Sequence, residues 1–221
     1  MNAILYILII LIPVIAQINI SSSYGKYKKV KNSTGLSGFE VARKILDANG
    51  LEDIYVVETN GNLTDHYDPN RKVIKLSKDI FKGETIAAAS VAAHECGHAI
   101  QDKESYTFMR IRSFLVPVVN LVSSFSWAVI FIGLISEAFN IFIFGIGLIS
   151  IGLIFQLVTL PVEFDASKRA KKELEKLNLI GKGEDVGVSK MLGAAAMTYV
   201  ASVLTSVLQI IRLIAVFNDR R

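Results

Sequence analysis

The chain has 221 residues, with 24 Lys and Arg against 20 Asp and Glu, which gives a formal net charge of +4 at pH 7. Apolar residues make up 52% of it, yet charged residues still make up 20%, so the apolar residues must be concentrated in blocks. The positive charge would suit nucleic acid, but it clusters beside those blocks, which is typical of a membrane protein. We therefore expect a lipid bilayer, and no nucleic acid, as partner.

The first apolar block runs from Met1 to Ile20 and predicts an N-terminal transmembrane helix over residues 1–21. A basic cluster, Lys26–Lys31, follows it. A cleaved signal peptide is the alternative, but such a signal carries its positive charge before the apolar stretch rather than after it. We therefore expect a retained membrane helix.

Residues 22–113 predict a small mixed domain outside the bilayer. A short helix is expected over Ser37–Asn49, because the side chain of Ser37 can cap its N-terminus. Two short strands are expected over Ile54–Glu58 and Lys72–Leu76, because both are bounded by turn residues and the second has β-branched residues at its centre. The polar segment Asn60–Asn70 between them predicts a loop.

Two further apolar stretches, Phe114–Ile135 and Ala138–Leu160, are each long enough as a helix to cross a hydrocarbon core of about 30 Å. They predict a transmembrane hairpin over residues 114–160. The hairpin tip around Glu137 has no Lys or Arg, so the positive-inside rule places the polar segments in the cytoplasm. We expect a multi-pass protein of the cell membrane.

After the hairpin, residues 161–189 predict an amphipathic helix that starts beyond Pro161 and turns Phe164 inward. Residues 190–221 predict a C-terminal apolar helix. Its many Ala, Ser and Thr residues suit close packing inside a helix bundle, so its status as a membrane span is left open.

The segment with the clearest chemistry lies in an alanine-rich predicted helix, Glu84–Asp102, whose ends are charged. Residues 94–98 read His-Glu-Cys-Gly-His. The four-residue spacing leaves His94 and His98 about 40° apart around a helix, so both imidazoles can bind one metal ion. Glu95 lies beside that face and can act on a metal-bound water. Zinc suits this set, since its catalytic sites combine imidazole and carboxylate ligands with one open position.

A catalytic zinc site needs a third protein ligand, and the candidates are Glu163, Asp165, Asp102 and His66. Glu163 is preferred because it follows a membrane span directly, which places its carboxylate at the same membrane surface as His94. The alternative for Glu163 is a carboxylate that only favours a helix N-terminus.

Three more assignments concern residues around this centre. His66 and Tyr199 are candidate oxyanion or substrate contacts, although a loop histidine and a membrane-helix aromatic are the simpler interpretations. The strand Lys72–Leu76 offers an edge to which an extended peptide could add. Cys96, the one cysteine in the chain, is expected to be a buried packing residue.

Three longer segments carry a family resemblance: residues 63–69 (Leu-Thr-Asp-His-Tyr-Asp-Pro), residues 91–101 around the two histidines, and residues 160–170. On these the chain resembles the YugP-like neutral zinc metallopeptidases, membrane proteins related in plan to HtpX-like and CAAX-processing proteases. The resemblance implies that His94, His98 and Glu163 bind zinc and that Glu95 is the general base. In HtpX-like relatives an aspartate stands four residues after the glutamate, whereas this chain has Ser167.

These observations together predict a predominantly α membrane protein with three to four transmembrane helices and a small α+β zincin-like metallopeptidase domain. The expected activity is that of a membrane-bound zinc metalloendopeptidase, with one catalytic Zn2+ and a peptide or protein substrate. A site-2-type intramembrane protease is one alternative, and a non-enzymatic zinc-binding membrane scaffold is the other.

Overall fold

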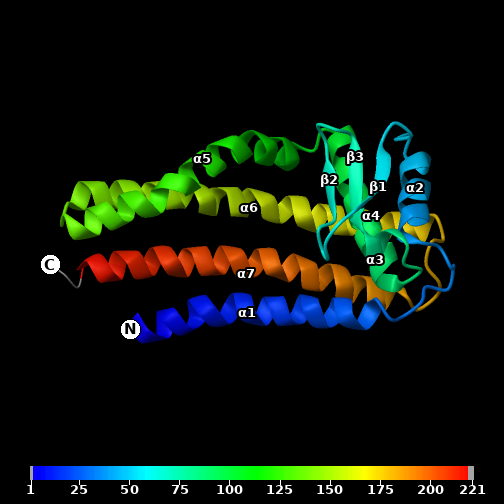
Figure 1. Cartoon of the computed structure of the whole chain (residues 1–221), viewed down its shortest axis with the longest axis horizontal. Helices are drawn as coiled ribbons and strands as arrows, with labels where there is room; N and C mark the ends of the chain where they lie inside the picture. The colour runs from blue at the N-terminus through cyan, green and yellow to red at the C-terminus, as the bar shows by residue number, and fades with distance from the viewer. Residues whose placement is uncertain (1, 219–221) are drawn as a thin grey trace. The chain divides into compact units, whose positions relative to one another are not determined.

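The computed structural model describes residues 2–218 (Figure 1). In chain order its elements are α1 (Asn2–Tyr27), α2 (Gly38–Ala48), β1 (Tyr55–Thr59), β2 (His66–Asp68), β3 (Val73–Ser77), α3 (Lys78–Phe81), α4 (Ile86–Lys103), α5 (Thr107–Ile135), α6 (Phe139–Lys176) and α7 (Asp185–Asn218).

The chain divides into two compact units, each described by itself. The helical unit holds the residues up to Gln17, Thr107–Pro161 and the residues from Thr198 onward. The mixed unit holds Ile18–Tyr106 and Val162–Met197, and therefore all three strands. Helices α1, α6 and α7 contribute residues to both units.

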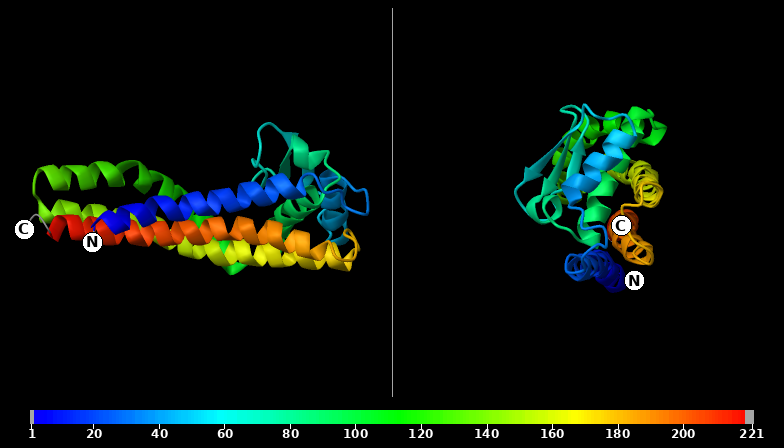
Figure 2. Two further views of the ribbon diagram at one scale, coloured as in Figure 1. Left: turned by 90° about the horizontal axis from the view of Figure 1, so that it is seen from below. Right: turned by 90° about the vertical axis from the view of Figure 1, so that its right-hand side faces the viewer.

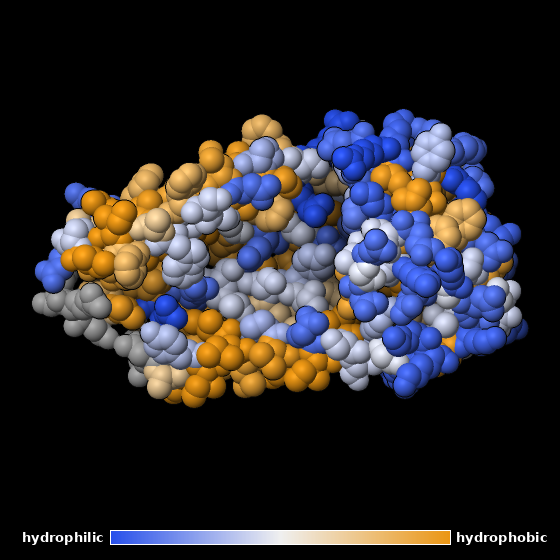
Figure 3. Space-filling model, in the orientation of Figure 1, coloured by the Kyte–Doolittle hydropathy of each residue, from blue (hydrophilic) through white to orange (hydrophobic). Residues whose placement is uncertain are grey.

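The helical unit is built from long apolar helices. Four helices, α1, α5, α6 and α7, are long and apolar enough to cross a membrane, which confirms the predominantly α membrane fold and includes the C-terminal segment among the candidates. Many of their large apolar side chains are exposed, such as Ile10 at 64% and Phe131 at 64%, as expected where lipid replaces water. Figure 3 shows apolar side chains gathered over this unit and hydrophilic ones over the mixed unit.

The expected helix boundary after Pro161 is absent. Helix α6 runs from Phe139 through Pro161 to Lys176 without a break, although proline removes one backbone hydrogen bond. The turns that follow it are held by packing: Val162, Ala166 and Ala170 are fully buried. Phe164 does not point inward as expected, because it is 49% exposed.

The mixed unit contains a three-stranded sheet in the order β1-β3-β2, with β1 parallel and β2 antiparallel to β3. β2 lies within the segment expected to be a loop. β3 is the central strand and is buried on both faces. Both of its edges are therefore paired, so the expected free edge at Lys72–Leu76 is wrong; β1 and β2 are the edge strands.

Helix α4 is the buried centre of the mixed unit. It contacts α2, α3, β2 and β3, and Figure 2 shows the sheet and α2 beside it. The side-chain oxygen of Thr85 caps its N-terminus by accepting a hydrogen bond from the backbone N–H of Ala88 at 3.2 Å. Its small residues let the neighbouring elements approach closely, and six of its alanines are fully buried: Ala87, Ala88, Ala89, Ala92, Ala93 and Ala99. The site described next is therefore carried by a firmly packed helix.

Candidate metal centre

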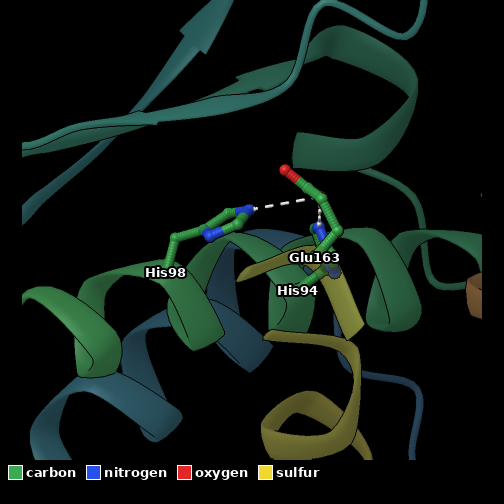
Figure 4. Close-up of side chains that lie close together, drawn as sticks. All are labelled: His94, His98 and Glu163. Carbon is green, nitrogen blue, oxygen red and sulfur yellow. Dashed lines mark hydrogen bonds and ion pairs between the residues drawn. The ribbon is translucent and has the colours of Figure 1, made fainter. Parts of the chain in front are cut away.

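Three side chains from two helices converge in the mixed unit (Figure 4). His94 and His98 come from α4, and Glu163 comes from α6. The Nε2 atom of His94 lies 3.2 Å from Oε2 of Glu163, and Nε2 of His98 lies 3.7 Å from the same oxygen. All three side chains have little exposure, at 15%, 11% and 4%. A carboxylate buried between two imidazoles is the arrangement expected of a metal site.

A glycine lets the two helices meet closely enough to form this cluster. A Cβ atom added at Gly97 would lie 2.5 Å from the backbone oxygen of Ala166, which is closer than real Cβ contacts allow. Gly97 stands between the two histidines on α4, and Ala166 lies three residues beyond Glu163 on α6. The absence of a side chain at Gly97 therefore sets the distance between the halves of the site.

The geometry of the cluster fits a zinc ion. Two donor atoms that are each about 2.0–2.1 Å from a tetrahedral ion lie about 3.3–3.4 Å apart. The two nitrogen-to-oxygen distances to Glu163, 3.2 and 3.7 Å, bracket that value. The potential ligand atoms of His94, His98 and Glu163 all lie within 4.8 Å of one another. Two imidazoles and one carboxylate are also the donor types that zinc takes in catalytic sites.

The ring of His98 is oriented from behind by Gln101. The Nδ1 atom of His98 lies 3.0 Å from Oε1 of Gln101. The amide nitrogen of Gln101 donates to the backbone oxygen of Val162 and to Oδ2 of Asp165, both at 2.8 Å. Because these two partners are acceptors, they fix which end of the amide faces His98. His98 must then donate from Nδ1, which leaves the lone pair of Nε2 for a metal ion.

Three charged side chains, Asp165, Arg169 and Glu104, extend the hydrogen-bond network behind Gln101. Oδ2 of Asp165 also accepts a hydrogen bond from Nε of Arg169 at 2.5 Å, and Nη1 of Arg169 donates to Oε2 of Glu104 at 2.7 Å. Gln101 itself is fully buried, so leaving any of its polar atoms unpaired would be costly. The network thereby ties the end of α4 to α6 at the level of the site.

The ring of His94 has a different and longer contact. Its Nδ1 atom lies 3.3 Å from the hydroxyl oxygen of Ser167. Ser167 stands four residues after Glu163, at the position where the resemblance to HtpX-like proteases would imply an aspartate. A hydroxyl oxygen can accept the Nδ1 proton as a carboxylate would, but without its charge. The serine therefore provides support of the same kind in a weaker form.

Glu95 lies next to His94 in the sequence and is only 7% exposed. Among the described residues, none gives its carboxylate a hydrogen bond or an ion pair. A carboxylate with so little exposure and no protein partner is costly unless water or a ligand satisfies it. Its oxygens are therefore available to a water molecule or a substrate.

The cluster changes the titration of His98. Burial lowers the pKa of His98, but hydrogen bonding to Glu163 and the negative charges of Glu95 and Glu163 outweigh that effect, and the pKa rises above its ordinary value of 6.5. The raised pKa means that the site holds positive charge well. A divalent cation satisfies the same demand.

The other candidates for the third ligand lie elsewhere. His66 is exposed on β2, with Nδ1 2.8 Å from the backbone oxygen of Thr64. Asp102 is exposed and accepts a hydrogen bond from the hydroxyl of Tyr67 at 3.0 Å. Asp165 supports Gln101 instead of joining the cluster. Within residues 2–218, Glu163 alone among the candidates meets both histidines.

Three further residues complete the comparison with the sequence. Cys96 is fully buried, and its sulfur faces the backbone oxygen of Ala42 at 3.6 Å, as expected of a packing residue. Tyr199 belongs to the helical unit, and its role and that of His66 as substrate contacts stay predictions. Gln101 was missed, although its place three residues after His98, on the same helix face, was a usable signal.

Comparison with known proteins agrees with this geometry. A family model described as "Putative neutral zinc metallopeptidase" matches residues 2–218. The chain is 45% identical over 206 residues to the "Putative membrane protease YugP" of Bacillus subtilis (strain 168), with 93% of this chain and 92% of that protein covered. No solved structure matches the chain. With its four apolar helices and its cluster of two histidines and a glutamate, the chain belongs to this family of membrane-associated neutral zinc metallopeptidases.

Proposed function

We propose that the chain is a membrane-bound zinc endopeptidase in which His94, His98 and Glu163 bind one zinc ion and Glu95 is the general base. The observation that carries the proposal is the convergence of the three donors from two helices, with their ligand atoms within 4.8 Å of one another. Family membership supports zinc and peptidase chemistry. The residue roles and the cleavage of internal peptide bonds are our assignment.

A zinc ion held by this set would supply a Lewis acid that polarises the scissile carbonyl and makes a water molecule more acidic. The chain's own residues carry the proton. Glu95, which has no protein partner among the described residues, takes a proton from the attacking water and returns it to the leaving amine. Its low exposure, 7%, keeps bulk water from competing for that proton.

Two residues that do not contact the substrate orient the imidazole rings of His94 and His98 for metal binding. Gln101 accepts the Nδ1 proton of His98, which selects the tautomer in which Nε2 is free to act as a ligand. The hydroxyl of Ser167 contacts Nδ1 of His94 and helps to orient that ring. Preorganised rings avoid an ordering cost when the metal ion binds.

The site faces the cytoplasm, outside the hydrocarbon core. Helix α4 is not one of the four candidate spans found among the described residues, which disfavours the site-2-type alternative. The 38 residues of α6 make a helix of roughly 57 Å, about twice the thickness of a hydrocarbon core. Its apolar part precedes Pro161, so Glu163 lies beyond a complete span. The basic residues beside the apolar helices favour the cytoplasmic side.

The donor set also disfavours a structural zinc site in a non-enzymatic scaffold. Structural sites are usually closed by four protein ligands and are rich in cysteine. The cluster among the described residues offers three donors, and Cys96 faces α2 instead. Three donors leave the open position that catalysis requires.

The edge strand β2 is the element best suited to hold an extended peptide. Its register on β3 pairs Tyr67 with Ile74, and the Tyr67 hydroxyl donates to Asp102 near the end of α4. These contacts fix β2 beside the helix that carries both histidines. A substrate strand added to the outer edge of β2 would gain backbone hydrogen bonds with little dependence on its sequence.

The proposal is tested by Glu95→Gln in the purified full-length protein. The change removes the basic carboxylate and leaves the three donors in place. We expect bound zinc equal to that of the wild type and cleavage of a quenched fluorescent peptide lowered by about a hundredfold or more. Both quantities are measured on the same sample.

Glu52→Gln is the matched control, because Glu52 is exposed and the chemical change is identical. It should cleave as the wild type does. A Glu95→Gln protein that binds zinc and cleaves at the wild-type rate would show that Glu95 is not the base.

A further inference from the structure

A cavity of about 650 Å³ lies in the mixed unit. None of the three proposed metal ligands, His94, His98 and Glu163, lines it. Segments of α1, α6 and α7 line it with three kinds of side chain: basic, small polar and apolar. The lining residues are Asn19, Ser23, Phe164, Ser167, Lys168, Lys171, Lys190, Leu192, Gly193, Ala194, Ala196 and Met197. This volume suits a small-molecule ligand or a lipid headgroup.

The charge of the cavity is one-sided. Lys168, Lys171 and Lys190 line it, and no aspartate or glutamate does. Within the part of the chain that the structure describes, none of these three lysines forms an ion pair with a carboxylate. Three unpaired ammonium groups around one cavity attract an anion strongly, and Asn19 and Ser23 add hydrogen-bonding groups.

The apolar part of the lining indicates what else the ligand carries. Phe164 and Met197 are 49% and 50% exposed, so both can contact a ligand in the cavity. They suit a ligand that joins a negative charge to hydrocarbon. A free phosphate ion would leave both side chains in water.

The position of the lining along its helices identifies that ligand further. On α6 the lysines come within about three turns after the apolar stretch that ends at Leu160, and on α7 Lys190 directly precedes the apolar stretch that begins at Met191. The long side chains of lysines at such points can reach back to the lipid headgroups, where basic pockets between membrane helices bind anionic lipids.

We propose that this cavity binds the headgroup of an anionic phospholipid. The lysines contact the phosphate, the polar side chains of α1 contact the glycerol part, and Phe164 and Met197 contact the first carbons of the acyl chains. Ser167 belongs both to this lining and to the support of His94, so a bound lipid lies one side chain from the metal site.

The test is lipid binding to the detergent-solubilised full-length protein, measured by native mass spectrometry with dioleoyl phosphatidylglycerol and dioleoyl phosphatidylcholine. We expect tighter binding of the first. The double variant Lys168→Ala/Lys190→Ala should weaken it by about twenty-five-fold, because each lysine near an anionic headgroup contributes about fivefold. Binding of phosphatidylcholine should not change.

Two further variants separate a built site from general surface charge. Lys172→Ala/Lys182→Ala removes two exposed lysines that do not line the cavity, so it should bind phosphatidylglycerol as the wild type does. Gly193→Leu should block binding without removing charge, because an added Cβ there meets nothing within 4 Å and leucine favours a helix.

Each contrary outcome overturns the proposal. Equal loss in both double variants would indicate non-specific attraction. Equal affinity for phosphatidylglycerol and phosphatidylcholine would show that the lysines do not select an anionic headgroup. Glycerol phosphate that binds as tightly as the lipid would indicate a soluble ligand, and an acidic peptide that binds where phosphatidylglycerol does not would indicate a substrate subsite. None of these readouts requires peptidase activity, so they stand apart from the proposed function.

Discussion

His98 and His94 lie one turn apart on α4 and face the same carboxylate, but the regions behind them differ. His98 is held at 3.0 Å by Gln101, a fully buried amide whose nitrogen has two further partners on α6. His94 is held at 3.3 Å by the hydroxyl of Ser167. One imidazole is therefore fixed by a saturated network, and the other by a single longer contact.

The difference shows where the two halves of the site are joined. Gln101 orients His98 and at the same time bonds to Val162 and Asp165, which flank Glu163 on α6. One amide thus fixes a ligand on α4 and the position of the helix that carries the third ligand. Ser167 and His94 make only one such contact. We therefore expect disruption on the His98 side to cost more.

The largest effect should come from separating the helices at the point that serves both histidines. In Gly97→Ala the new Cβ would lie 2.5 Å from the backbone oxygen of Ala166, and a backbone atom cannot rotate away. The clash is relieved only if α4 moves away from α6, which draws both histidines away from Glu163. We expect the zinc affinity, measured by chelator competition, to fall by about a hundredfold, the upper end of the range for lost support of metal ligands.

Gly147→Ala on α6 is the control for this change, because a Cβ there meets nothing within 4 Å. It should bind zinc as tightly as the wild type. If Gly97→Ala behaves like this control, the close approach of α4 and α6 is not what assembles the site.

A smaller loss is expected from Gln101→Leu. The variant removes the acceptor for His98 and leaves the buried oxygen of Val162 without its donor. We expect zinc affinity to fall by about thirtyfold, within the range for such supporting residues. The unfolding free energy of the zinc-free protein should fall by about 1–3 kcal/mol. If the variant is less stable but binds zinc as tightly as the wild type, Gln101 serves the packing of the protein and does not support the metal site.

The smallest effect should come from Ser167→Ala, which removes the one contact behind His94. Because that contact is neutral and 3.3 Å long, we expect zinc affinity to fall by less than about tenfold. The unfolding temperature of the zinc-free protein should barely change. A loss as large as that of Gln101→Leu would reverse the ranking of the two histidines.

The parts of this picture that depend on short-range pattern were predictable. The four-residue spacing of His94 and His98 required only a helix, and the alanine-rich segment around them specified one. The capping serine of α2 was recognised for the same reason, and Ser37 forms a full capping box with Glu40. The long apolar blocks likewise identified the membrane helices.

The parts that depend on tertiary contacts were not predictable in the same way. Pro161 is a helix breaker by local rules, yet packing at Ala166 carries α6 past it. The strand β2 is three residues long and forms only because β3 offers it an edge. The contacts of Gln101 with Val162 and Asp165 join residues about sixty positions apart, and no local pattern specifies such a pairing.

The central claim is that the zinc site is split between α4 and α6. The most direct test measures bound zinc per chain in Glu163→Ala beside His66→Ala and Asp102→Ala, the rival third ligands, each purified as the full chain with its folding checked by thermal unfolding. The split site predicts that Glu163→Ala loses its zinc while the other two retain about one ion per chain. Retention of zinc by folded Glu163→Ala, or its loss from either rival variant, would contradict the account.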